Sequence, residues 1–494
     1  MDNRILLIQL PGYGLQTASS VYALQEEGVD ILDLNLDLTR QICGDGYRLA
    51  TDDDSLSKLC GHVVDFKSRV KRLHDFDAFS GFVFPHAGKI RGYKLFGVSL
   101  NGDWLKPLAV NMAAFIRGLR PDATIAVGGA LILDYYPEIA PSLLDAGFDI
   151  VVFGDGRSQL RELLSSGDVQ RCFSSVFSRN GTPWITSRKE APLGMPRFHP
   201  NISLYPYPQI LTVPINMGCY YGRCSFCAER SYSGSSVYYK FPNEEIISAL
   251  RHMQASGVPF VWLGGSGIRK EELRGLLKEL NACGDGIPKY GLESRAIAID
   301  EELAGLLKRS RCSKISFGLE CPDEHICNQI YNKGIDIPGF LAGLRHLEQA
   351  GYRRVSINIV ISSLFHDHAK LDDIAGFLNS YDCVTDYVLY LLSVTQGKSI
   401  ETIAASRLEK PMTKPLGPEH MFRPEGEAEW FKGAMRYLAS KVEKPFGVFM
   451  DENTSLQLWS LVEDDQIPDF RRRFYRAQLS ISNADFKPNK PVWR

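Results

Sequence analysis

Three cysteines are crowded on one short segment of the chain. Cys219, Cys224 and Cys227 fall within nine residues, whereas the others of the 11 cysteines are scattered. Three thiolates on one loop can bind three corners of a cubane iron–sulfur cluster, because a short loop bends around a single centre. The fourth iron then has no protein ligand. Such an open position can bind a substrate or cosubstrate, just as an open position makes a zinc site catalytic.

Two other interpretations of this segment are open. Structural zinc usually takes four ligands in two paired clusters, and the chain has no second close pair, since Cys321 and Cys327 are six residues apart. Alternatively, the three cysteines are small buried hydrophobic residues. The types and spacing of the residues favour the iron–sulfur site.

An alternation of apolar strands and amphipathic helices surrounds the cysteine segment. It runs through residues 209–400 and gives six strand–helix units. The expected strands are Ile210–Val213, Phe260–Leu263, Tyr290–Glu293, Ile315–Gly318, Val355–Val360 and Tyr387–Leu392. These units predict a (β/α)6 partial barrel, and active sites of such barrels gather at the carboxyl ends of the strands. The cysteines follow the first strand, so we expect them at that end.

A second alternation fills residues 1–170. The expected strands are Ile5–Ile8, Val29–Leu34, Phe82–Phe84, Phe96–Ser99, Thr124–Val127 and Ile150–Phe153, with helices that include Ala18–Glu27 and Leu108–Leu119. Continuous apolar strands separated by helices predict a doubly wound parallel sheet covered on both faces. Ligands of such sheets lie over the carboxyl ends of the strands. At those ends the chain carries small residues that let a large cofactor approach, namely Ser99, Gly128, Gly129 and Gly154.

Two further segments complete the expected α/β fold. Residues 171–208 are rich in proline and predict a linker without regular elements. Residues 401–494 begin with a loop-rich passage and contain a helical stretch at Glu427–Val442. We expect this last part to be a mainly helical region that caps the cavity and excludes water.

The composition excludes several classes of function. The 494 residues carry 56 Lys and Arg against 58 Asp and Glu, a net charge of -2, whereas domains that bind duplex nucleic acid are usually strongly basic. No apolar run approaches the ~18 residues of a membrane-spanning helix, and the pattern of an export signal is absent. We therefore expect a cytoplasmic protein with no nucleic-acid or membrane partner.

The cysteine segment and the strand ends resemble those of radical S-adenosylmethionine (SAM) enzymes. That family has Cys-x3-Cys-x2-Cys after the first barrel strand, with an aromatic residue just before the last cysteine. Phe226 fills the aromatic place, but the spacing between Cys219 and Cys224 is one residue longer. The resemblance covers roughly residues 208–400 and implies that the three cysteines bind a 4Fe-4S cluster. It also implies that SAM is bound by Phe226, Gly264, Gly265, Ser266, Glu293, Arg295, Glu320 and Asn358.

The first domain resembles the cobalamin-binding domain that precedes the radical SAM domain in one subclass. The resemblance rests on Leu7–Pro11, Val127–Gly129 and Asp149–Gly156. It implies that cobalamin is bound by Pro11, Ser99, Leu100, Asn101, Gly128, Gly129 and Gly154. No Asp-x-His-x-x-Gly follows the first strand, so we expect no histidine below the cobalt. No Gly-x-Gly-x-x-Gly fingerprint opens the first helix, which argues against NAD. The alternative is a doubly wound domain without a ligand.

Together the two resemblances imply a cobalamin-dependent radical SAM enzyme. The implied activity is methylation of an unactivated carbon in a natural-product or peptide substrate, through a 5′-deoxyadenosyl radical and methylcobalamin. An external one-electron reductant of the flavodoxin or ferredoxin type is the implied partner. One alternative uses the same cofactors for a rearrangement, oxidation or cyclisation without methyl transfer. A second is a sensor or binding module, although a sensor does not need an open iron.

Overall fold

The chain divides into two compact units. Unit 1 consists of residues 1–47, 62–207 and 231–235, and unit 2 consists of residues 48–61, 208–230 and 236–494. The computed structural model describes residues 4–12, 14, 21, 28–44, 50–129, 132, 139–152, 176–178, 210–227, 238–265, 267–392, 394–395, 399–407, 421–422, 424–446, 459 and 461–485.

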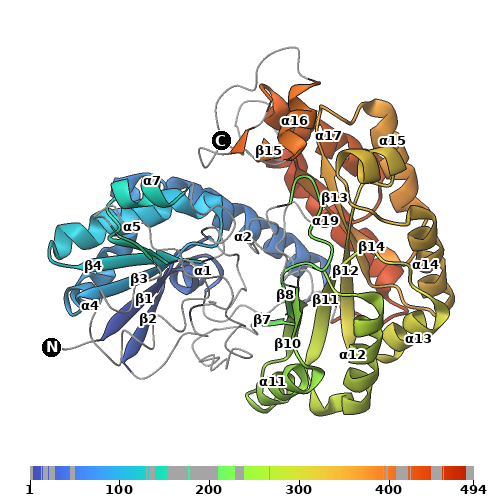
Figure 1. The fold of residues 1–494 in the computed structure, drawn as a ribbon, viewed down its shortest axis with the longest axis horizontal. Coiled ribbons are helices and arrows are strands. Elements are labelled where there is room, and N and C mark those ends of the chain that lie inside the picture. The colour runs from blue at the N-terminus through green and yellow to red at the C-terminus, as the bar shows by residue number, and fades with distance from the viewer. Residues whose placement is uncertain are drawn as a thin grey trace. The chain divides into compact units, whose positions relative to one another are not determined.

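Unit 1 is built on a six-stranded sheet of order β2-β1-β3-β4-β5-β6, whose strands β1 to β4 are coloured blue to cyan in Figure 1. Its strands are β1 Ile5–Gln9, β2 Val29–Asp33, β3 Leu95–Ser99, β4 Thr124–Gly128, β5 Ile150–Val152 and β6 Val176–Ser178. Strands β1 to β5 run parallel. Every residue of β1 is buried, as is typical of a parallel sheet covered on both faces. The strand order is that of a doubly wound fold, which confirms the expected fold class.

Helices connect these strands. They are α1 Leu34–Cys43, α2 Asp53–Arg72, α3 Phe76–Val83, α4 Ala87–Arg91, α5 Lys106–Leu119 and α7 Ala140–Asp145. Helix α5 matches its sequence prediction closely, whereas the long helix α2 was not predicted. The predicted helix Ala18–Glu27 lies almost wholly outside the described residues.

The predicted strand Phe82–Phe84 is wrong. Phe82 lies in the last turn of α3, and Phe84 begins a short 3-10 helix. The carboxylate of Asp75 caps α3 by accepting a hydrogen bond from a backbone N–H, and Phe79 and Val83 bury one helical face four residues apart. The cap and this spacing outweigh the strand preference of a short apolar run.

Strand β6 corrects the expectation that residues 171–208 lack regular elements. It pairs antiparallel with β5 at the edge of the sheet. An antiparallel edge strand on an otherwise parallel sheet is common, since it satisfies the open backbone groups of its neighbour. The remainder of residues 171–208 lies outside the described residues.

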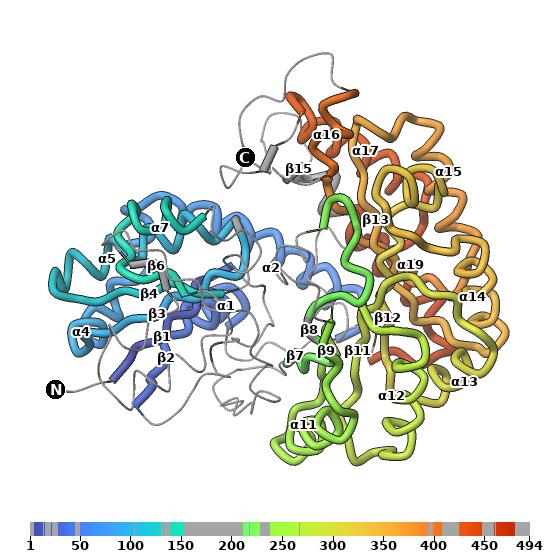
Figure 2. The backbone as a smooth tube through the Cα atoms, in the orientation of Figure 1, coloured from blue at the N-terminus to red at the C-terminus, as the bar shows by residue number. Residues whose placement is uncertain are grey.

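Unit 2 is built on a parallel sheet of order β14-β13-β12-β11-β10-β7. Its strands are β7 Ile210–Pro214, β10 Phe260–Gly264, β11 Lys289–Arg295, β12 Cys312–Glu320, β13 Val355–Ile361 and β14 Val384–Leu391. The helices between them are α11 Asn243–Ala255, α12 Lys270–Cys283, α13 Glu301–Arg309, α14 Ile337–Gln349 and α15 His368–Asn379, and Figure 2 traces their alternation with the strands. In the described residues β7 and β14 are the two edges and do not pair with each other. The predicted partial barrel is therefore confirmed.

The C-terminal region is mainly helical, as predicted, with α16 Ser399–Ala405, α17 Glu427–Lys441 and α19 Ile467–Asp485. Helix α17 packs on α15, and α19 packs on β14. The amide side chain of Gln478 on α19 accepts a hydrogen bond from the Phe446 N–H and donates one to its carbonyl, at 2.9 and 3.0 Å. Helix α19 was not predicted from the sequence. Among the described residues, no helix has the length and apolar character that crossing a membrane requires.

Candidate functional site

One face of the unit 2 sheet is polar. The strand register aligns Glu293 with Ser316 and Ser316 with Ser356, so these side chains share a face. Other residues of that face are Arg295, Lys314, Gly318, Asn358 and Asp386. The opposite face is apolar and buried, with Leu292, Ile315, Phe317 and Ile357. Parallel sheets covered by helices on both faces are apolar throughout, so the polar face is suited to line a ligand-binding interior.

A buried ion pair occupies the amino-terminal part of this polar face. The ammonium of Lys314 lies 2.7 Å from the carboxylate of Asp386, and both side chains are almost fully buried. Ser356 and Thr385 donate hydrogen bonds to the same carboxylate at 3.1 and 2.8 Å. Because each of these two buried charges has a partner of opposite sign, the burial cost of the pair is offset.

The three cysteines lie on a loop directly after β7 and the short strand β8 Asn216–Met217. Each is partly buried and forms no disulfide. The loop is anchored at Ser225, whose N–H donates to the Tyr331 carbonyl at 2.9 Å and whose hydroxyl donates to the Ile330 carbonyl at 2.7 Å. Asn332 donates its side-chain N–H to the Arg223 carbonyl at 2.9 Å. The loop is thus held to residues 330–334, which follow the π-helical turn His325–Ile330.

Burial raises the pKa of the Cys224 thiol, and the positive charges of Lys333 and Arg295 act in the opposite direction. These two cations favour the thiolate, the form that binds metal, but burial has the larger effect and the pKa of Cys224 stays above its ordinary value. Among the described residues, no group of three or more His, Cys, Asp or Glu side chains is gathered for a single metal ion. A cubane cluster bonds each thiolate to a different iron, so its ligands do not have to converge on one point.

The turn after β10 packs against the cysteine loop. A Cβ added at Gly265 would lie 1.7 Å from Oδ1 of Asn216, and one added at Gly267 would lie 3.1 Å from Sγ of Cys219. Asn216 donates hydrogen bonds to the carbonyls of Gly218 and Gly267, at 3.3 and 2.5 Å. Its Oδ1 is buried and has no hydrogen-bond partner in the described part of the chain. A buried acceptor without a donor fits a ligand that carries an amino group, such as SAM. The predicted residue Ser266 lies outside the described residues.

Two predicted SAM-binding residues pack on the structure around the loop. The ring of Phe226 meets that of Tyr331 edge to face, with centroids 5.3 Å apart. The guanidinium of Arg295 lies over the ring of Tyr221 at 4.0 Å and is 9% exposed. Glu293, another predicted residue, lies half-buried on the polar face.

The remaining predicted residues lie on β12 and β13. The carboxylate of Glu320 forms an ion pair with Lys333, and Ser316 donates a hydrogen bond to Oδ1 of Asn358 at 3.3 Å. The backbone of Glu320 has φ 71° beside an irregularity in the β12–β13 register. The nearby Gly318 has no side chain to obstruct the pair, since a Cβ there would lie 2.8 Å from the Glu320 carboxylate. A strained conformation stabilised in this way is typical of functional positions.

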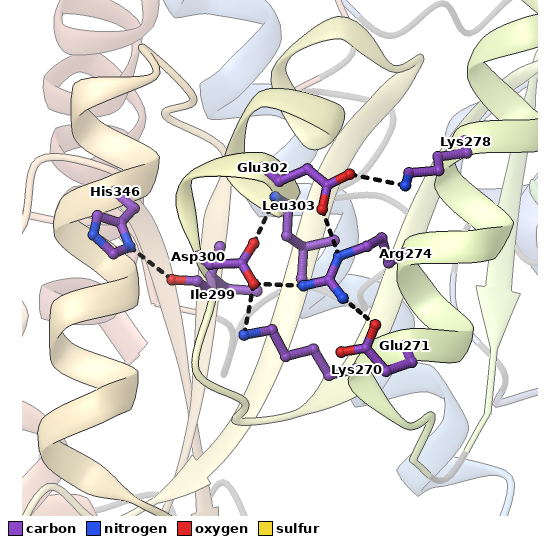
Figure 3. A network of polar contacts seen from close by, with 9 residues as sticks. All are labelled: Lys270, Glu271, Arg274, Lys278, Ile299, Asp300, Glu302, Leu303 and His346. Carbon is purple, nitrogen blue, oxygen red and sulfur yellow. Dashed lines mark hydrogen bonds and ion pairs between the residues drawn. The ribbon is translucent and has the colours of Figure 1, made fainter.

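A surface network fixes the loops that follow β10 and β11 (Figure 3). Arg274 of α12 pairs with Glu271, Asp300 and Glu302. Asp300 also caps α13 by accepting the Leu303 N–H at 2.9 Å. His346 of α14 contacts the Ile299 carbonyl at 2.8 Å through Nδ1. These contacts join α12 to the start of α13.

In unit 1, predicted cobalamin-binding residues lie together at the carboxyl ends of adjacent strands. Gln9, Ser99 and Gly128 end adjacent strands in register, so Pro11, Leu100, Asn101 and Gly129 follow at the same edge. A Cβ at Gly129, where φ is 129°, would lie 2.4 Å from Oδ1 of Asn101. The side chain of Leu100, just after β3, is fully buried. The small residues and the backbone at these strand ends are suited to a large planar ligand. The predicted residue Gly154 lies outside the described residues.

Several residues of the site were not predicted from the sequence. Asn216 and Lys333 contact or face the cysteine loop, and Tyr221 is part of it. The sequence carries a signal for Lys333 alone. It stands between Asn332 and Gly334, and asparagine and glycine are the residue types that tolerate the left-handed conformation. Both Asn332 and Gly334 adopt it, with φ 48° and 57°.

Comparison with known proteins identifies this region. Residues 213–367 match the family described as the radical SAM superfamily. The chain contains a radical SAM domain. The three cysteines, the glycine turn and the strands β11 to β13 all lie within that domain, which confirms the recognition of the family from the cysteine segment.

The whole chain also resembles a solved structure. The radical S-adenosylmethionine methyltransferase TsrM from Kitasatospora setae, with cobalamin and a [4Fe-4S] cluster bound, matches at TM-score 0.66 and 15% identity, covering 97% of this chain and 100% of that one. TsrM with tryptophan substrate and the SAM analogue aza-SAM matches at TM-score 0.63 and 15% identity, covering 97% and 99%. The comparison with curated proteins gave no significant match. At this identity the likeness shows that both units share the fold of TsrM.

Proposed function

We propose that this chain is a cobalamin-dependent radical SAM methyltransferase. The observation that carries the proposal is the extent of the structural likeness. The match covers the full length of TsrM, a single chain solved with both cobalamin and a [4Fe-4S] cluster bound, and it extends across both units of this chain. The cysteine loop of unit 2 and the strand-end edge of unit 1 each supply residues suited to one of these groups.

In the proposed enzyme, Cys219, Cys224 and Cys227 hold the cluster, and the strand ends of unit 1 hold cobalamin. When bound, the cluster supplies one electron for cleavage of a sulfonium, and cobalamin supplies a transferable methyl group. Asn216 offers its Oδ1 to the amino group of SAM. Lys333 supplies a buried positive charge near the thiolates.

The substrate in this proposal is a natural product or a peptide, methylated at a carbon. The polar face around Ser316 and Asn358 can donate and accept hydrogen bonds, so it suits a substrate with polar groups beside the methylated carbon. Because TsrM has been solved with tryptophan bound as its substrate, tryptophan is a candidate to test. A flavodoxin or ferredoxin in the cytoplasm is the proposed electron donor.

The experiment is an anaerobic assay of the full chain, reconstituted with iron, sulfide and cobalamin. We expect one corrinoid and one cluster per chain, consumption of SAM in the presence of a reductant, and a product heavier by one methylene-sized unit. The variant Cys224→Ala should lose the brown cluster absorbance and SAM consumption. The matched variant Cys283→Ala, at a partly buried cysteine on α12, should retain both.

Other outcomes contradict defined parts of the proposal. A product without added mass assigns the chain to rearrangement, oxidation or cyclisation. Binding of both groups without SAM consumption at any substrate assigns it to a sensor. Failure of unit 1 to bind a corrinoid, with the cluster intact, indicates a doubly wound domain without a ligand.

A further inference from the structure

We infer that Arg295 is a positioning residue that holds the cluster-binding loop in place before any cluster is present. The inference rests on the proposed function, since it concerns the same three cysteines. It explains how a loop with four residues between Cys219 and Cys224 keeps a defined shape. The four residues are Tyr220, Tyr221, Gly222 and Arg223.

The guanidinium of Arg295 is committed to this spacer. Its carbon lies 4.0 Å above the ring of Tyr221 and 5.8 Å from the ring of Tyr220. Nη1 donates to the Tyr220 hydroxyl at 3.2 Å, and Nη2 donates to the Gly334 carbonyl at 3.0 Å. A desolvated cation over an aromatic face is a strong contact. Arg295 therefore joins the end of β11 to the spacer and to the segment after the π-helical turn.

The hydroxyl of Tyr221 makes a second contact. Its hydroxyl donates to the Asn332 carbonyl at 2.8 Å. Gly334, at φ 57°, lies so close that a Cβ there would be 2.4 Å from the same hydroxyl. Asn332 in turn donates to the Arg223 carbonyl. Tyr221 is thus fixed between Arg295 and residues 332–334, and the residue just before Cys224 is fixed with it.

A second arginine supports the other tyrosine. The guanidinium carbon of Arg269, the residue before α12, lies 5.8 Å from the ring of Tyr220 and 4.7 Å from that of Tyr238. The rings of Tyr220 and Tyr238 meet edge to face at 6.0 Å. All of these contacts are among protein groups alone, so they can order the loop in the cluster-free chain. An ordered loop binds its cluster without first losing conformational freedom.

The test is hydrogen exchange of the loop amides in the cluster-free full chain, followed by reconstitution. We expect Arg295→Met to raise exchange at residues 223–227 and to speed iron loss to a chelator, each on the order of tenfold. Tyr221→Leu should have similar effects. The double variant should exchange and lose iron little faster than either single variant, because both substitutions remove the same contact. Arg295→Lys should rescue only in part, since an ammonium cannot lie flat on the ring. The control Arg309→Met changes an exposed arginine on α13 and should behave as wild type.

Two results would overturn the inference. In the first, Arg295→Met shows the same amide exchange and iron retention as wild type but binds SAM more weakly in equilibrium dialysis. That result would make Arg295 a SAM ligand, as the sequence suggests. The second is full additivity of the two single variants. Failure of the proposed function is a separate result, because a wild-type chain that binds no iron would still report loop protection through exchange.

Discussion

Lys333 and Glu320 form a buried ion pair beside the cysteine loop, and each side chain is only 10% exposed. The ammonium lies 5.9 Å from the ring centroid of Phe226. Burial works against a charged lysine. The Glu320 carboxylate, its hydrogen bond and the thiolates of Cys224 and Cys227 nevertheless hold the pKa of Lys333 above its ordinary value. Lys333 therefore keeps its positive charge beside the cysteine loop, although the pair as a whole is neutral.

Replacing that charge should change the electron affinity of the bound cluster. We expect Lys333→Met to make its reduction potential more negative on the order of 60 mV, which corresponds to ~1.4 kcal/mol for one electron. The cause is loss of a cation that stabilises the reduced, more negative cluster. The measurement is a redox titration followed by electron paramagnetic resonance.

The same substitution leaves the Glu320 carboxylate buried and unpaired. It should lower the free energy of unfolding by about 3–5 kcal/mol. The double variant Lys333→Met/Glu320→Gln removes both charges and should recover most of the stability and of the potential. An unchanged potential in the single variant, or equal potentials in the single and double variants, would contradict this electrostatic explanation.

Gly265 should not tolerate a methyl group. In Gly265→Ala the Cβ would lie 1.7 Å from Oδ1 of Asn216, so Asn216 must move and release its hydrogen bonds to Gly218 and Gly267. We expect SAM binding to weaken at least tenfold by equilibrium dialysis. Gly286→Ala is the matched control, because a Cβ there meets nothing within 4 Å. The double variant Gly265→Ala/Asn216→Ala removes the clash, and a fold that stayed disrupted in it would point to another cause.

Gly129 in unit 1 should not tolerate a methyl group either. Its φ of 129° is unfavourable for any side chain, and a Cβ would lie 2.6 Å from the Leu100 carbonyl oxygen. Gly129→Ala should lower the free energy of unfolding by about 1–3 kcal/mol and reduce the corrinoid bound per chain. Gly118→Ala on α5 has open space around it and should stabilise the helix slightly. Equal corrinoid binding in Gly129→Ala and wild type would remove this edge from the proposed cobalamin site.

His366 should make the stability of unit 2 depend on pH. Burial lowers the pKa of His366 to about 4, although Asp323 and Asp367 favour its charged form. An unfolded histidine binds its proton near pH 6.5. Between those values the unfolded chain holds a proton that the folded chain does not, so stability falls as pH falls. The expected loss is ~1.4 kcal/mol per pH unit within this window.

Urea unfolding of the cluster-free chain between pH 7 and pH 4.5 measures this loss. His366→Gln should flatten the pH dependence, whereas His325→Gln, at an exposed histidine, should leave it unchanged. The same slope in His366→Gln and wild type would show that other groups are responsible.

The sequence by itself determined the alternating strands and helices of the unit 2 sheet and the kind of chemistry. Strand and helix periodicity are local properties, so β10 to β14 and their helices could be located from residue types alone. The three cysteines identified the loop because their spacing is a local property too. Phe82–Phe84 shows where this fails, since a capping carboxylate at Asp75 and packing at Phe79 decided in favour of a helix.

Only the tertiary structure decided which distant residues surround the cysteines. Arg295 stacks on Tyr221 across 74 positions of the chain, and Lys333 reaches Glu320 because a register irregularity and a left-handed backbone turn that carboxylate towards it. Oδ1 of Asn216 lies against a glycine turn about 50 residues later and has no hydrogen-bond partner in the described part of the chain. Each of these contacts depends on which residues the parallel strands bring together at their carboxyl ends. No single segment of the sequence encodes that arrangement.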